Sequence, residues 1–212
     1  MSVALHGYFR SSAAWRVRIA LRLKGLAFEN VFHHLRRNEQ NAADYLAINP
    51  QGLLPTLDLG GGKILTQSLA ICEYLDAMYP EPPLLPAEPF ECAKVRAFAQ
   101  AIACDIHPVQ NLKILNRLRE HGFAEAAVNA WAKVTIDEGL NACAALLEAA
   151  PAGDFCFGNQ PTLADVFLLP QLGSARRFAV DLRWPRMLEI EERCMQMPAF
   201  RAAIPALQPD AE

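Results

Sequence analysis

The chain has 212 residues, of which 52% are apolar and 20% are charged, so it is long enough for one or two globular domains and is not disordered. Its net charge of −3 argues against a general nucleic-acid-binding protein. The charge is uneven, because residues 1–80 carry 8 Lys and Arg against 6 Asp and Glu, a balance of +2, and the remainder carries −5. The basic first part suits a small anionic ligand.

The cysteines and apolar runs exclude several classes of protein. No apolar run reaches membrane-spanning length and no signal-peptide core is present, so we expect a cytoplasmic protein. The six cysteines are scattered without a C-x-x-C pair, which predicts neither a disulfide framework nor a metal site. They are Cys72, Cys92, Cys104, Cys143, Cys156 and Cys194.

A strand, a polar turn and a helix open the chain. Residues 3–9 alternate in character as a buried strand does, and Ser11 or Ser12 can then cap a helix with one apolar stripe. The free N–H groups and dipole at such a helix N-terminus favour an anion. Ser11 adds a hydroxyl donor and Arg10 a positive charge, which leads to the hypothesis that the anion is a thiolate.

The next elements complete an α/β domain. Residues 28–32 alternate as a second strand, and residues 35–47 are polar and loosely helical. Two further strands are predicted over 53–59 and 63–66, joined by a glycine turn, before a helix capped by Ser68. The order βαβ followed by ββα predicts a thioredoxin-like domain over residues 1–80.

Prolines are concentrated after this domain, and the pattern beyond them is helical. Residues 81–89 therefore predict a stiff linker, and residues 90–212 an all-helical second domain. The expected helices span residues 90–119, 123–149, 162–176, 185–196 and 198–204. Thr162 and Asp165 form a start like a capping box, which assigns Asp165 a structural role.

Three segments carry a resemblance to a known family. They are Ser11-Ser12-Ala13-Ala14-Trp15-Arg16-Val17-Arg18-Ile19-Ala20-Leu21, Asn49-Pro50-Gln51-Gly52-Leu53-Leu54-Pro55-Thr56-Leu57 and Gln67-Ser68-Leu69-Ala70-Ile71. In their order and spacing they resemble the signature segments of zeta-class glutathione transferases. The resemblance implies a thioredoxin-like domain followed by the helical glutathione-transferase domain, with glutathione as the bound thiol.

The resemblance also implies which residues hold glutathione. Ser11 would donate to the sulfur, and Leu54 would pair its backbone with the cysteinyl unit beside a cis Pro55. Gln67 and Ser68 would hold the γ-glutamyl end. Gln40 and Gln51 are weaker candidates for the glycyl end and the peptide backbone.

In the helical domain, two further segments resemble the family. By that resemblance Asp105 would reach the glutathione of the partner subunit in a homodimer, and His107 and Asn111 would line the acceptor pocket. His107 can equally be a histidine at a helix kink. Arg177 falls on the family arginine that reaches the acceptor, with Arg176 as a surface residue or a second contact.

The implied reaction is cis–trans isomerisation of a maleyl-keto acid in aromatic-compound catabolism. The glutathione thiolate would add reversibly to the double bond, and Arg10 and Arg177 would bind carboxylates and the developing oxyanion. Both maleylacetoacetate and maleylpyruvate remain open as the substrate, because Ala13 stands where the family signature has a cysteine.

Other readings of the same residues are a general zeta-class transferase or haloacid dehalogenase, which would consume glutathione, and a non-catalytic interaction module. A disulfide oxidoreductase is set aside, because the turn at residues 10–14 has no cysteine.

Overall fold

The computed structural model describes residues 3–150 and 152–212. The chain divides into two compact units, one formed by Met1–Leu84 together with Met195–Glu212, and the other by Leu85–Cys194. Residues 195–212, expected as part of the helical domain, thus lie with the first unit. The boundaries proposed at residues 80 and 90 stay predictions.

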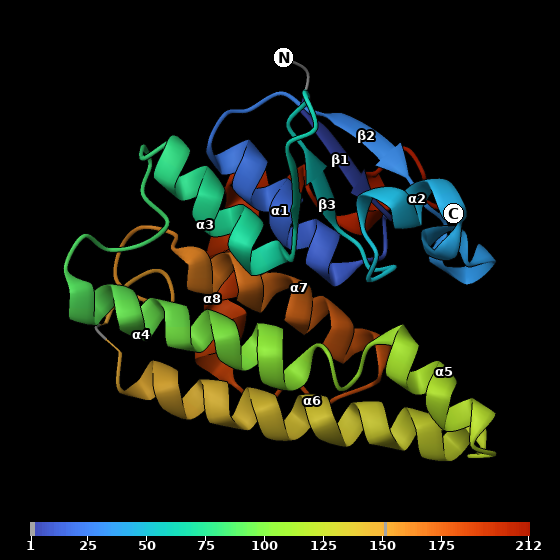
Figure 1. Ribbon diagram of the computed structural model, residues 1–212. Coiled ribbons are helices and arrows are strands. Elements are labelled where there is room, and N and C mark those ends of the chain that lie inside the picture. Colours follow the sequence, from blue (N-terminus) through green and yellow to red (C-terminus); the bar gives the residue numbers. More distant parts are fainter. Residues whose placement is uncertain (1–2, 151) are drawn as a thin grey trace. The chain divides into compact units, whose positions relative to one another are not determined.

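The first unit is built on a four-stranded sheet with the order β2-β1-β3-β4 (Figure 1). The central strand β1 (Ala4–Gly7) pairs in parallel with β2 (Glu29–Phe32) and antiparallel with β3 (Thr56–Asp58). A tight turn of three glycines leads from β3 to the antiparallel β4 (Ile64–Thr66). This mixed sheet confirms the predicted thioredoxin-like arrangement.

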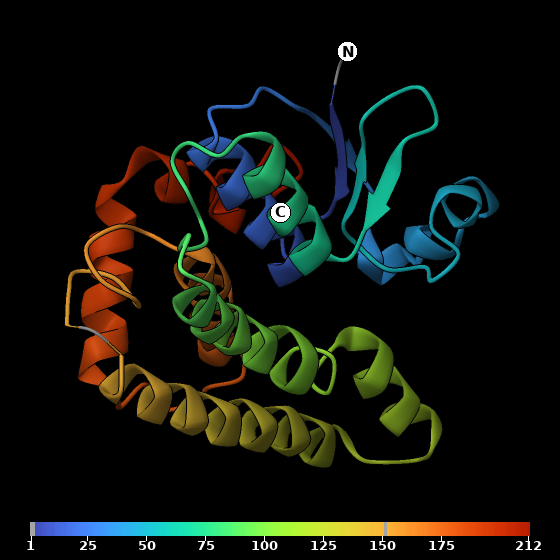
Figure 2. The same ribbon diagram turned by 60° about the vertical axis from the view of Figure 1, so that its left-hand side comes forward.

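Two long helices cover one face of the sheet, α1 (Ser12–Leu23) and α3 (Ser68–Met78), whereas α2 (Ala43–Ile48) lies on the other side (Figures 1 and 2). The apolar stripe of α1 is fully buried, as its spacing predicts. The short helix α9 (Pro198–Arg201) also packs on α1. Short 3₁₀ turns are η1 (Leu35–Arg37), η2 (Glu39–Asn41) and η4 (Pro205–Leu207).

The regular elements of the second unit are helices, and one isolated β-bridge joins Phe155 and Gly158. Its helices are α4 (Pro89–Gln100), α5 (Leu112–Glu120), α6 (Glu125–Glu148), α7 (Leu163–Arg177) and α8 (Pro185–Gln196). The almost wholly buried α7 forms its core. At its start Thr162 and Asp165 make the predicted reciprocal capping box, and Asp165 Oδ1 also accepts from the Cys156 N–H at 2.8 Å.

Three local predictions were wrong. The helix expected over 90–119 is broken after a π-helical turn (Ala101–Ile106), because Pro108 lacks an N–H and Asn111 caps α5 by accepting from Lys113 N–H at 3.1 Å. The strand expected over 53–59 is reduced to β3, since its first part is held in a loop. Ser68 does not cap α3 but is its first residue.

Candidate functional site

Ser11 caps α1 and faces the helix N-terminus with its hydroxyl. Its Oγ accepts from the Ala14 N–H at 3.2 Å, so the hydroxyl proton is left to donate elsewhere. The first turn of α1 carries no acidic residue that would compete for the positive end of the helix dipole. This corner of the first unit can therefore stabilise an anion, as the sequence predicts.

The loop before β3 presents backbone groups for pairing. The Leu53 carbonyl accepts from Tyr45 Oη at 2.6 Å and from Asn49 Nδ2 at 2.7 Å. These two hydrogen bonds hold the loop in place. The Leu54–Pro55 peptide bond is cis, as the resemblance implies. No hydrogen bond to the Leu54 backbone is found within residues 3–150 and 152–212, so an extended ligand can pair with it.

Gly52 shapes the same loop. Its φ of +60° lies in the left-handed region, and a Cβ there would meet the Asn41 side chain and come within 3.3 Å of the Gln40 carbonyl. Glycine adopts this backbone conformation without strain. The loop is thereby kept against the segment that carries Gln40.

Gln67 and Ser68 lie where β4 passes into α3. Gln67 has a φ of +68° and donates from Nε2 to Gln51 Oε1 at 2.8 Å, so two of the predicted glutathione ligands contact each other. Ser68 is buried, and its Oγ lies 3.3 Å from Arg16 Nη1. Because a guanidinium can only donate, the Ser68 oxygen accepts this bond and its own proton can go to an anion.

Arg16 contacts a candidate site residue and is not among the residues predicted from the sequence. It is 1% exposed and links α1 to the first residue of α3. The signal available in the sequence was a charged residue within the buried face of the first helix. Such an arginine is rarely buried without a specific partner.

Gln40 and Arg10 complete the predicted residues of the first unit. Gln40 donates from Nε2 to Asn38 Oδ1 at 3.2 Å, while its Oε1 is buried without a hydrogen-bond partner in the described part of the chain. Arg10 is half-buried and directly precedes Ser11.

The predicted residues of the helical unit follow the π-helical turn and the end of α7. Asn111 Nδ2 donates to His107 Nε2 at 3.1 Å, which brings these two together. Arg177 is exposed at the end of α7, and its neighbour Arg176 forms a bidentate ion pair with Glu191. Asp105 is exposed.

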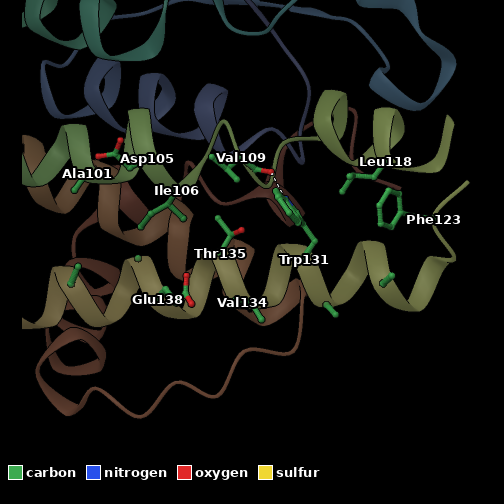
Figure 3. A pocket seen from close by; sticks show the side chains of 14 residues that line it. Ala101, Asp105, Ile106, Val109, Leu118, Phe123, Trp131, Val134, Thr135 and Glu138 are labelled. Carbon is green, nitrogen blue, oxygen red and sulfur yellow. Dashed lines mark hydrogen bonds between the residues drawn. The ribbon is translucent and has the colours of Figure 1, made fainter. Parts of the chain in front are cut away.

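Asp105 lies at the edge of an apolar groove of about 710 Å³ (Figure 3). The groove runs between the π-helical turn and α6, and its walls include the exposed apolar side chains Phe123, Trp131 and Val134. Trp131 Nε1 donates to the Val109 carbonyl at 3.1 Å, the dashed line in Figure 3. The groove is therefore a surface with a fixed aromatic wall.

The buried thiols of the protein are poor candidates for a nucleophile. Burial raises the pKa of Cys72 and of Cys143 to about 12, and the pKa of Cys156 is raised as well. In the described ranges, no group of three or more His, Cys, Asp or Glu side chains is placed to hold a metal. A search of the same residues finds no helix that is both long and apolar enough to cross a membrane.

The comparisons with known proteins agree with this fold. Residues 10–78 match the family model of the glutathione S-transferase N-terminal domain, and residues 116–207 match that of the C-terminal domain. The chain belongs to the glutathione S-transferase family, and the resemblance to its zeta class is confirmed.

Individual relatives show which enzymes of the family the chain is similar to. The chain is 46% identical to a maleylpyruvate isomerase of Ralstonia sp, over 98% of this chain and 99% of the relative. It is 44% identical to a maleylacetoacetate isomerase of Pseudomonas aeruginosa, over 97% of each. A solved maleylacetoacetate isomerase of Methylobacterium extorquens AM1, with bound malonate and glutathione, is 38% identical, covers 99% of each chain and has a TM-score of 0.95.

Proposed function

We propose that this protein is a glutathione-dependent cis–trans isomerase that acts on a maleyl-keto acid. The observation that carries the proposal is Ser11 at the N-terminus of α1, with a hydroxyl proton free to donate to a thiolate. Relatives over nearly the full length are isomerases of this kind, and one was solved with glutathione and a dicarboxylate bound. Both the local chemistry and the relatives support the same reaction.

In this proposal the first unit binds glutathione along its whole length. Ser11 and the α1 N-terminus would hold the sulfur, and the Leu54 backbone beside Pro55 would pair with the cysteinyl unit. The unpaired Leu54 backbone supports that assignment. Ser68, with Gln67, would bind the γ-glutamyl carboxylate through its available proton and the start of α3.

The glycyl end falls to weaker candidates, Gln40 and Gln51. The buried Oε1 of Gln40 lacks a hydrogen-bond partner within the described residues, and an N–H of the bound peptide would satisfy it.

Glutathione, when bound, supplies a sulfur that can add reversibly to a conjugated double bond and so permit rotation about it. The chain's residues keep that sulfur ionised: Ser11 donates to it, and the α1 dipole lowers its pKa. Arg10 is the proposed partner of a substrate carboxylate, since arginine forms bidentate bonds to carboxylates. In the helical unit Arg177 has the same proposed role, with His107 and Asn111 as acceptor-binding residues.

The substrate within this class is either maleylpyruvate or maleylacetoacetate. Ala13, which is buried in the first turn of α1, leaves no protein thiol at this point of the site. The nucleophile then comes from glutathione alone. The relatives include isomerases of both substrates at nearly equal identity, so a direct comparison of rates must decide.

A transferase or haloacid dehalogenase acting on the same pocket is the alternative. Such an enzyme consumes glutathione in proportion to product, whereas an isomerase returns it. Product formation should therefore exceed the glutathione supplied by at least about tenfold in a reaction with limiting glutathione. If the amount of product formed equals the amount of glutathione lost, the isomerase proposal is overturned and the transferase alternative takes its place.

We propose further that the protein is a cytoplasmic homodimer in which the groove of Figure 3 is part of the interface. Phe123, Trp131 and Val134 are 54%, 46% and 53% exposed, and contiguous apolar surface of this kind is typical of an interaction site. Asp105 at its edge could then reach the partner's glutathione. Six free cysteines fit a reducing compartment.

Light scattering of two variants tests the dimer. Trp131→Glu places a charge in the groove and should give a monomer. Leu146→Glu changes an equally exposed apolar residue of α6 that does not line the groove, and should leave the dimer intact. If the Trp131→Glu protein stays dimeric, the groove is not part of the dimer interface.

A further inference from the structure

The residues after α9 fold back onto the turn that carries the candidate thiolate site. We define residues 203–212 as the clamp segment. Arg18 of α1 donates from Nε to the Ala203 carbonyl at 3.1 Å, and from Nη2 to the Phe9 carbonyl at 3.0 Å. One buried guanidinium thus joins the start of the clamp segment to the residue that precedes Arg10.

Asp210 makes the second connection to the same turn. Its Oδ2 accepts from the Phe9 N–H at 2.8 Å, across 201 positions of the chain. Its Oδ1 is buried without a hydrogen-bond partner in the described residues. Phe9 therefore has its N–H held by Asp210 and its carbonyl held by Arg18, which leaves little freedom to the turn that leads into Ser11.

Glu212 connects the clamp segment to the loop after β2. Its Oε1 lies 2.8 Å from His34 Nε2. His34 Nδ1 accepts from the Arg37 N–H at 3.2 Å, so the ring proton is on Nε2 and donates to Glu212. The His34 N–H in turn donates to Glu39 Oε2 at 2.6 Å, next to Gln40.

The clamp segment itself is held in a fixed shape. Gln208 is buried, and its Nε2 donates to the carbonyls of Ala202 at 3.1 Å and Ile204 at 2.8 Å. Asp210 and Glu212 therefore belong to a folded segment.

We infer that residues 203–212 position the glutathione site, with Asp210 fixing the turn that carries Arg10 and Ser11, and Glu212 fixing the loop that carries Gln40. Asp210 and Glu212 are positioning residues, because they act through Phe9 and His34. This role presupposes the glutathione site proposed above.

The charge of Asp210 and its hydrogen bond to Phe9 should have opposite effects on the pKa of the bound thiol. As a negative charge near the turn, Asp210 disfavours a thiolate, so removing the charge alone would lower the pKa of the bound thiol. As a positioning residue it has the reverse effect, because loss of the bond to Phe9 lets Ser11 and the first turn of α1 move from the sulfur. The pair Asp210→Asn and Asp210→Ala separates the two, since asparagine keeps an oxygen acceptor without charge.

The experiment measures the thiol pKa of bound glutathione from its thiolate absorbance, together with kcat and the exchange rate of the Phe9 amide without ligand. Asp210→Ala should raise the thiol pKa by about 1 unit, lower kcat at neutral pH about tenfold and speed amide exchange at least about tenfold. Asp210→Asn keeps an acceptor for the Phe9 N–H, so kcat and amide exchange should stay near the parent values, and its thiol pKa should be equal to or slightly below that of the parent. Glu212→Gln should weaken glutathione binding about threefold through the loop, without changing the thiol pKa.

Glu148→Ala is the matched control, because this exposed acid lies on α6 and should change nothing. If Asp210→Ala melts earlier but keeps the thiol pKa and kcat measured below its melting temperature, Asp210 is only structural and the inference is overturned. A lowered thiol pKa in both Asp210 variants would mean that Asp210 acts through its charge alone, and would also overturn the inference. If the parent protein itself does not bind glutathione, the proposed function fails instead, and this inference with it.

Discussion

At the scale of single residues, Ser11 caps α1, and in the proposed mechanism it also donates to a thiolate. Ser11→Ala removes both, and should cost about 1 kcal/mol of stability and raise the pKa of the bound thiol. Ser11→Asp restores a good cap but repels the sulfur. It should therefore be more stable than Ser11→Ala and yet bind the thiolate more weakly, as judged by melting temperature and thiolate absorbance. Activity in Ser11→Asp equal to that of the parent would remove Ser11 from the mechanism.

Also at this scale, Arg16 should act through Ser68. Ser68→Ala and Arg16→Gln should each weaken glutathione binding about tenfold, and the double variant should be no weaker than either, because both break one interaction. Cysteinylglycine, which lacks the γ-glutamyl unit, should bind all four proteins alike in calorimetry. Additive losses, or equal losses for cysteinylglycine, would show that Arg16 serves the fold in general.

At the scale of elements, a buried ion pair joins the end of α1 to α3. Lys24 Nζ lies 2.6 Å from Asp76 Oδ1, which also accepts from the Leu84 N–H at 2.7 Å. Lys24→Met leaves this carboxylate without its cation and should lower the free energy of unfolding by about 3 kcal/mol. Urea denaturation measures the change in the free energy of unfolding, and Lys63→Met, at an exposed lysine, is the control. Equal stability of both variants would mean that the pair contributes nothing.

At the scale of the whole molecule, His6 in β1 and His33 directly after β2 should make stability depend on pH. His6 Nδ1 lies 2.9 Å from His33 Nε2, and burial lowers the pKa of both below 6.5, although Asp58 opposes this for His6 and Asp44 and Glu39 for His33. A histidine with a lower pKa in the folded state resists protonation there. Its contribution to stability is present above about pH 6.5 and is lost as the pH falls below that value.

The melting temperature of the parent protein should therefore fall between pH 7 and pH 5, and should fall less in His33→Gln. His121→Gln changes an exposed histidine of the helical unit and should keep the parent's slope. Parallel pH profiles for His33→Gln and the parent would contradict this account.

Local patterns were sufficient to predict the elements that carry the site. Alternation in residues 3–9 and the serines before an apolar stripe located β1 and the N-terminus of α1, because capping and amphipathicity are encoded within a few residues. The fold-back of Asp210 onto Phe9 could not be predicted, since nothing local relates residues 201 positions apart. The sequence indicates at most a helix kink near His107 and not the full break before α5, because helix continuation depends on packing beyond the segment.

The site was predicted unevenly for the same reason. Family segments predict Ser11, Leu54 and Ser68, whereas the contact of Arg16 with Ser68 could not be predicted because the two residues lie on different helices. Roles in the helical unit stay predictions, as do the individual glutathione ligands.

The most direct test of the account is isomerisation of maleylpyruvate and of maleylacetoacetate, each with and without catalytic glutathione. We predict turnover of at least one substrate that requires glutathione and leaves its concentration unchanged, and the ratio of the two rates identifies the substrate. Turnover without glutathione, or no turnover of either substrate while glutathione is bound, would contradict the account.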